Sequence, residues 1–126
     1  MTLADTSVWI EHFREGKPAL KDLLVQGLVL MHPAIRGELA CGCLAARPQM
    51  LGYFCALPHA KTATDAEVLQ LIEHRKLWGV GIGWIDAHLI ACALLSGCVL
   101  WTLDRRLKEA AASAQVKMYE RVSAER

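Results

Sequence analysis

The chain has 126 residues, of which 54% are hydrophobic and 21% are charged. This length suits one domain, residues 1–126, with a substantial core, and the composition excludes a chain that is disordered for lack of apolar residues. Fourteen Lys and Arg against 13 Asp and Glu give a net charge of +1. That charge is low for a protein that binds nucleic acid through its overall field. Any RNA-binding function must therefore depend on a local site.

Neither the N-terminus nor the longest apolar region predicts a secreted or membrane protein. The N-terminal residues contain Asp5 and lack the basic residues that begin a signal peptide. The apolar region 79–103 is interrupted by Asp86 and His88, whereas a membrane span needs about 20 uninterrupted apolar residues. Four of the five cysteines fall in apolar patterns. We expect them to be small core residues with free thiols, as in a protein of the reducing cytoplasm. The sequence therefore predicts a cytoplasmic protein that does not enter a membrane.

The predicted elements alternate between short strands and helices along the chain. The helices have clear boundaries, since proline or a capping residue precedes several of them and glycine ends others. One boundary is a capping box, Thr64-x-x-Glu67. Strands are expected at residues 2–5, 28–31, 98–103 and, as a last edge strand, 116–119. Helices are expected at residues 6–14, 19–26, 34–46, 48–57, 64–78, 85–95 and 105–114. This alternation predicts an α/β fold, with a parallel β-sheet and helices on both faces.

Two acids occupy positions that helical periodicity assigns to apolar faces. Asp86 shares the inward face of its predicted helix with Leu89 and Ile90. Glu38 lies at the edge of an apolar stripe that includes Leu39 and extends toward Ala46. Neither position favours a carboxylate on grounds of burial alone.

Two further acids directly follow predicted strands. Asp5 follows the first strand, and Asp104 follows the strand at 98–103. In an open parallel sheet the carboxyl ends of the strands form the usual ligand crevice, so both acids are expected to face it.

A structural explanation exists for three of these acids. Asp5, Asp86 and Asp104 each stand at or near a helix start, where Asp is a good cap. Ser, Thr or Asn would cap equally well, however, and Glu38 is no cap. Four carboxylates in one apolar crevice must either bind a cation or take up protons. Such hard oxygen ligands suit Mg²⁺ or Mn²⁺ and the metal-assisted attack of water on a phosphodiester.

The order and spacing of these acids resemble a PIN-domain ribonuclease, in particular the VapC-type toxins of bacterial toxin–antitoxin pairs. The resemblance covers nearly the whole chain, and it depends on four motifs together, since the first alone would be weak. The motifs are Asp5-Thr-Ser after the first strand, Glu38 on the helix after Pro33, Trp84-Ile-Asp86-Ala-His-Leu opening a helix, and Trp101-Thr-Leu-Asp104 closing a strand.

The resemblance implies an endoribonuclease that depends on Mg²⁺ or Mn²⁺ and cuts tRNA or rRNA. It also implies a homodimer and a cognate antitoxin that inserts a segment near the acids. The hydroxyls of Thr6 and Thr102 would hold a water or orient a carboxylate. The catalytic and metal-binding roles would fall on Asp5, Glu38, Asp86 and Asp104.

Basic residues near the acids are candidates for RNA contact. Arg105 and Arg106 follow Asp104 and are placed to hold phosphates, although a solvated first turn of a helix is an equally good explanation of this pair. Lys17 is a further candidate, as are Arg14 and Arg36. His88 is expected to point away from Asp86 as a surface or partly buried residue.

Two alternative functions remain open at this point. A Mg²⁺-dependent phosphatase with Asp5 as nucleophile would need another Asp two residues later, where this chain has Ser7. In a non-catalytic interaction domain, the acids would be helix caps and the apolar surface would bind a partner.

Overall fold

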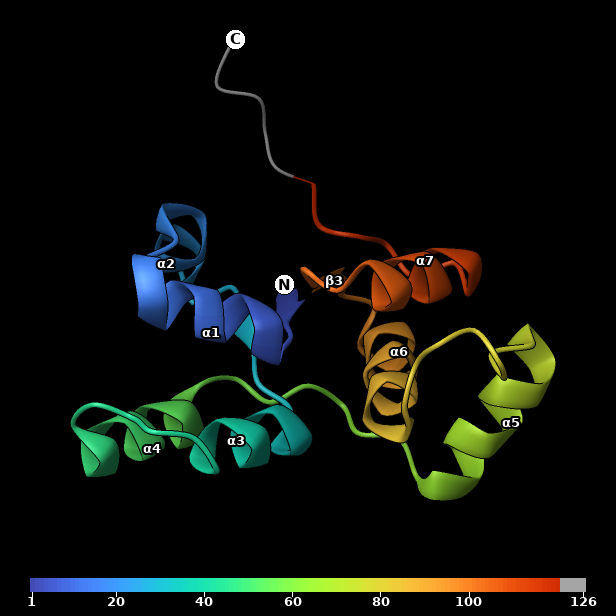
Figure 1. The fold of residues 1–126 in the computed structure, drawn as a ribbon, viewed down its shortest axis with the longest axis horizontal. Helices are drawn as coiled ribbons and strands as arrows, with labels where there is room; N and C mark the ends of the chain where they lie inside the picture. The colour runs from blue at the N-terminus through green and yellow to red at the C-terminus, as the bar shows by residue number, and fades with distance from the viewer. Residues whose placement is uncertain (121–126) are drawn as a thin grey trace, which may run out of the picture.

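The computed structural model describes residues 1–120 and has the alternating architecture that the sequence predicts (Figure 1). Each strand is short and leads into a helix within one to three residues. In chain order the elements are β1 (Thr2–Ala4), α1 (Thr6–Glu15), α2 (Pro18–Val25), β2 (Val29–Leu30), α3 (Pro33–Ala40), α4 (Arg47–Ala56), α5 (Asp65–Arg75), α6 (Trp84–Ser96), β3 (Val99–Trp101) and α7 (Arg105–Ser113). That residues 1–126 form one domain stays a prediction, because residues 121–126 lie outside the described residues.

The three strands form a parallel sheet in the order β2-β1-β3. Thr2 of β1 pairs with Val29 on one side and with Val99 on the other. Figure 1 shows α1 and α2 on the left of the strands and α6 and α7 on the right. The predicted α/β fold, a parallel sheet with helices on both faces, is confirmed.

The predicted edge strand at 116–119 is reduced to a single bridge. Leu100 pairs with Met118 in parallel, and the Leu100 amide donates to the Lys117 carbonyl over 2.9 Å. A second isolated bridge, which the sequence did not indicate, joins Met31 to His59 beyond the end of β2. The sheet therefore extends at both edges by one residue pair rather than by whole strands.

The third helix is shorter than predicted, since α3 ends at Ala40 rather than at Ala46. The Arg47 guanidinium donates to the Ala40 carbonyl over 2.6 Å and to the Gly42 carbonyl over 3.2 Å. These bonds satisfy carbonyls that the end of a helix leaves without partners. Ala46 itself has a φ of 49° and starts the turn into α4. The helix stops where a side chain from the next element replaces its backbone bonds.

The core lies between the sheet and the inner faces of the helices. Leu3 of β1 and Leu100 of β3 are fully buried, as are Ile90 of α6 and Phe54 of α4. The Phe54 ring packs edge-on against Trp9 of α1, with centroids 5.5 Å apart. This packing holds α1, whose start is capped by Asp5, against α4.

The cysteines were predicted incorrectly in part. Cys92 and Cys98 are buried core residues as expected, but Cys41, Cys43 and Cys55 are exposed. The first two of these lie in the turn that follows the shortened α3, where the chain no longer packs on the core. Helical periodicity carried past the true end of that helix accounts for this part of the error.

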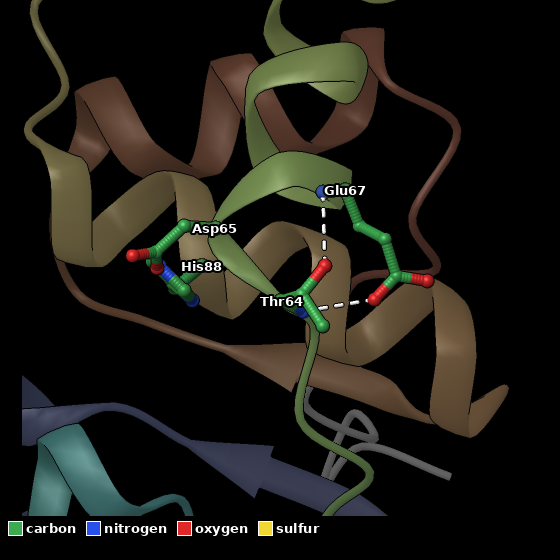
Figure 2. Close-up of polar contacts among 4 residues, drawn as sticks. All are labelled: Thr64, Asp65, Glu67 and His88. Carbon is green, nitrogen blue, oxygen red and sulfur yellow. Dashed lines mark hydrogen bonds and ion pairs between the residues drawn. The ribbon is translucent and has the colours of Figure 1, made fainter.

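The start of α5 is tied to α6, as Figure 2 shows. The Glu67 amide donates to the Thr64 hydroxyl, and the Thr64 amide donates to the Glu67 carboxylate, so the predicted capping box is confirmed. Next to it, His88 Nε2 lies 3.1 Å from a carboxylate oxygen of Asp65. The His88 side chain is 15% exposed, which confirms a partly buried residue that connects two helices. Among residues 1–120, no helix combines the length and apolar character that crossing a membrane requires.

Candidate active site

The four acids of the sequence prediction come from four different elements. Asp5 follows β1 and caps α1, and Asp104 follows β3 and caps α7. Because β1 and β3 are parallel neighbours, their carboxyl ends lie at the same edge of the sheet. Asp86 lies in the first turn of α6, and Glu38 lies in the second turn of α3.

Asp5 is the buried member of the site, with only 6% of its surface exposed. One carboxylate oxygen accepts from the Ser7 hydroxyl over 2.5 Å and from the Val8 amide over 3.3 Å. The other accepts from the Thr102 hydroxyl over 2.5 Å. Burial raises the pKa of Asp5, and the hydrogen bonds from Ser7 and Thr102 oppose that rise by favouring the charged form. These contacts fix both oxygens of the carboxylate in place.

The same hydroxyls join the ends of β1 and β3. Thr102 accepts from the Asp104 amide over 3.0 Å, and Ser7 accepts from the Leu103 amide over 3.0 Å. Asp5 and Asp104 are thereby held in one network, although 99 positions separate them in the sequence by their residue numbers. The Asp104 carboxylate in turn accepts from the Arg106 amide over 2.9 Å, which is the helix-capping role that the sequence allowed.

Glu38 is exposed but is held by a neighbouring helix. Its carboxylate accepts from the Thr6 hydroxyl over 2.5 Å. Thr6 and Thr102 thus each contact a carboxylate, as an orienting residue must. Their role in catalysis stays a prediction.

Asp86 is partly buried at the start of α6. Its carboxylate accepts from the Gly83 amide over 3.4 Å. Burial is the largest cause that raises the pKa of Asp86, and the charges of Asp104, Asp5 and Glu38 raise it further. Burial and these negative charges both favour the protonated form of the Asp86 carboxyl.

The donor set suits a divalent cation in its chemistry. Carboxylates supply hard oxygen ligands and a negative potential, which Mg²⁺ and Mn²⁺ prefer. Among residues 1–120, no three Asp, Glu, His or Cys side chains are gathered closely enough to hold one ion. Glu38 is turned to Thr6, and Asp104 caps α7. A shared metal therefore requires these two side chains to turn toward Asp86.

Comparison with known proteins gives the family of the chain. The PIN domain family profile matches residues 2–113. Two proteins named Ribonuclease VapC32, from the CDC 1551 / Oshkosh and ATCC 25618 / H37Rv strains of Mycobacterium tuberculosis, are each 43% identical over 124 residues. These alignments cover 98% of this chain and 100% of each relative.

The chain belongs to the PIN-domain family, among its VapC-type ribonucleases. The resemblance expected from the four motifs is thereby confirmed. The match at 2–113 contains every acid of the proposed site. The assignment of metal and catalytic roles to those acids stays a prediction.

The basic residues next to Asp104 differ from each other in their surroundings. Arg105 is exposed and its Nε lies 3.4 Å from a carboxylate oxygen of Glu109, which fits the solvated first turn. Arg106 packs over the glycine-rich loop before α6, since a Cβ added to Gly81 would come within 2.7 Å of its Cδ. Gly81 has a φ of 86° as well, a backbone conformation that favours glycine at this position. Contact with RNA by either arginine stays a prediction.

Sequence reasoning missed the role of Ser7 in this VapC-type site. Ser7 was regarded only as a residue that opens α1 and as the wrong residue for a phosphatase. In the structure its hydroxyl donates to Asp5 and accepts from Leu103. Leu103 is 96 residues away from Ser7 in the sequence, so no local pattern predicts this contact.

Proposed function

We propose that this protein is a Mg²⁺- or Mn²⁺-dependent endoribonuclease that hydrolyses RNA phosphodiester bonds and acts as the toxin of a toxin–antitoxin pair. The observation that carries the proposal is the hydrogen-bond network at the carboxyl ends of β1 and β3, in which Ser7 and Thr102 join the buried Asp5 to the start of α7. We propose that Glu38 and Asp86 complete this site. Membership of the VapC-type ribonucleases supports the ribonuclease and toxin assignments.

In the proposed mechanism the metal ligands are Asp5, Glu38, Asp86 and Asp104. A bound divalent ion would lower the pKa of a water molecule and offset the charge that develops on the phosphate. The chain's own part is to hold the carboxylates ready for this task. Fixed partners reduce the reorganisation that the reaction needs. They are Ser7 and Thr102 for Asp5 and the Gly83 amide for Asp86.

The proposed partners are an RNA substrate, tRNA or rRNA, a second copy of the chain and a cognate antitoxin. A mostly apolar groove of about 400 Å³ lies beside Glu38 and includes Ile10, Phe13 and Leu39. It supports the expectation that an antitoxin inserts an apolar segment near the acids. Phe13 is 41% exposed and Ile10 is 47% exposed, so the segment would cover side chains that otherwise face water. Light scattering at micromolar concentration should give twice the chain mass of 13.9 kDa for a homodimer.

The test is cleavage of labelled total RNA by the purified chain, freed of any bound peptide. Parallel reactions contain Mg²⁺, Mn²⁺ or EDTA, with Asp86→Asn beside the unaltered protein. Discrete fragments that need metal and disappear in the variant are expected. Equal fragments in EDTA, or from a folded Asp86→Asn variant, would refute the proposal.

The phosphatase alternative has no support in the structure. The position two residues after Asp5, where such a phosphatase needs a second Asp, is occupied by Ser7, whose hydroxyl donates to Asp5. The interaction-domain alternative does not explain the 43% identity to a protein named as a ribonuclease.

A further inference from the structure

A second cavity lies beside the acids, on the side of β3 that faces the turn between α1 and α2. Its volume is about 450 Å³, within the range of small-molecule sites. It is enclosed by the α1–α2 turn, the end of β3 and one turn of α7. The lining residues are Gly16, Lys17, Pro18, Ala19, Trp101, Thr102, Leu103, Lys108 and Tyr119.

Among residues 1–120, the charged side chains that line this cavity are both basic. They are Lys17 and Lys108, and neither forms an ion pair within those residues. The whole chain carries a net charge of only +1. Binding of an anion therefore needs a local site that is lined by basic side chains, and this cavity provides one.

The cavity is joined to the proposed catalytic acids by shared residues. Thr102 lines it and donates to Asp5 over 2.5 Å. The Lys108 amide donates to the Asp104 carbonyl over 2.9 Å, one turn into α7. A chain of nucleotides with one phosphodiester at the acids would thus bring a neighbouring nucleotide to the cavity.

The rest of the lining suits a nucleotide. The rings of Trp101 and Tyr119 stack with centroids 4.0 Å apart and 18° between their planes, which gives a rigid aromatic wall. The Lys17 amide is fixed by His12 Nδ1 over 2.9 Å, and Pro18 limits the next backbone angle. Rigid aromatic walls with lysines at the rim are typical of sites that bind single-stranded nucleic acid.

We propose that this cavity is a substrate subsite that binds one nucleotide of a single-stranded RNA segment, with Lys17 and Lys108 holding its phosphate next to the bond that is cut. This inference rests on the proposed ribonuclease function. It adds two substrate-binding residues to that function. Lys17 precedes α2, which contributes no acid to the proposed site, and Lys108 lies in α7 after the turn that Asp104 caps.

The test is RNA affinity as a function of salt. A fluorescein-labelled single-stranded RNA of ten nucleotides is titrated in EDTA, which prevents cleavage, and its anisotropy is followed from 0.1 to 1 M salt. Each phosphate contact with a single strand contributes a slope of about 0.7 in log Kd against log salt. Because both lysines hold the same phosphate, Lys17→Gln with Lys108→Gln should reduce the slope by about 0.7. The resulting loss of affinity is about fivefold at 0.1 M salt and vanishes near 1 M.

A matched control removes the same charge elsewhere. Lys61 and Lys76 are exposed and lie outside the cavity, so Lys61→Gln with Lys76→Gln should leave the slope unchanged. Lys17→Arg with Lys108→Arg should keep the slope of the unaltered protein. Equal losses in the Gln pair and the control pair would overturn the subsite, since overall charge alone would then explain binding.

Cleavage of total RNA in Mn²⁺ separates this inference from the proposed function. If the unaltered protein cleaves RNA and the Gln pair at 17 and 108 has an unchanged KM, the subsite is wrong and the nuclease stands. If the unaltered protein cleaves no RNA, but the Gln pair binds RNA with the expected smaller salt slope, the nuclease proposal is wrong and the binding site stands. The expected result is a raised KM with kcat retained.

Discussion

Replacing Thr102 by Val removes one hydroxyl from the centre of the site while keeping the shape of the side chain. Thr102 is 2% exposed, donates to the buried Asp5 and accepts from the Asp104 amide. In the variant, one oxygen of a buried carboxylate loses its donor. Leaving such a charged group without its partner costs about 2 kcal/mol. For a chain of this size, that corresponds to a fall in Tm of roughly 8 °C.

The effect of Thr102→Val should depend on pH. The hydrogen bond from Thr102 favours the charged form of Asp5, so its loss raises the pKa of Asp5 further. The penalty is therefore largest above that pKa, where Asp5 is ionised, and shrinks as pH falls through it.

The assay is urea unfolding in EDTA at neutral and at acid pH, with cleavage measured alongside. Thr62→Val is the matched control, because Thr62 is exposed, and it should change the unfolding free energy by less than about 0.5 kcal/mol. Thr6→Val removes the donor to the exposed Glu38, which water can solvate, so it should also change stability little. A Thr102→Val variant as stable as Thr62→Val would refute the view that Thr102 holds Asp5.

Two further predictions follow from the burial of other titratable groups. Burial and the neighbouring acids raise the pKa of Asp86 above the 3.8 of an ordinary Asp. Between 3.8 and this raised pKa, the folded chain binds more protons than the unfolded chain. The stability of the fold therefore falls as pH rises through that range. Asp86→Asn should therefore raise Tm at pH 7 in EDTA, with the gain disappearing below pH 3.8, and a lower Tm at pH 7 would contradict this. Burial also raises the pKa of Cys92 to about 11, and Cys98 is buried as well. Ellman's reagent at pH 8 should therefore react promptly with three thiols and with all five only after denaturation, whereas five prompt reactions would contradict the burial.

The sequence predicted the parts of this fold that depend on local patterns. Asp5 and Asp104 were placed at strand ends by short apolar runs, and the Thr64 capping box was read directly. The end of α3 was not predictable in this way, because Arg47 from the next element satisfies the carbonyl of Ala40. That contact is tertiary and has no local signal.

The candidate site was predicted as a set of residues but not as a geometry. Spacing and family resemblance selected the four acids, yet only the structure shows that Glu38 is turned to Thr6. The positive cavity was not predictable either. The sequence offered Lys17 as one of several candidates for RNA contact and did not offer Lys108. The two lysines line one cavity only because α7 packs beside the α1–α2 turn.

The central claim is that four carboxylates form one metal site that cuts RNA. The most direct measurement is Mn²⁺ binding by isothermal titration, made on the unaltered protein and on four single variants. The variants are Asp5→Asn, Glu38→Gln, Asp86→Asn and Asp104→Asn. Each should weaken Mn²⁺ binding at least about tenfold, as the loss of a ligand does, and should lose RNA cleavage in parallel. A variant that is folded, binds Mn²⁺ as tightly as the unaltered protein and still cleaves RNA would remove that residue from the site and contradict the account.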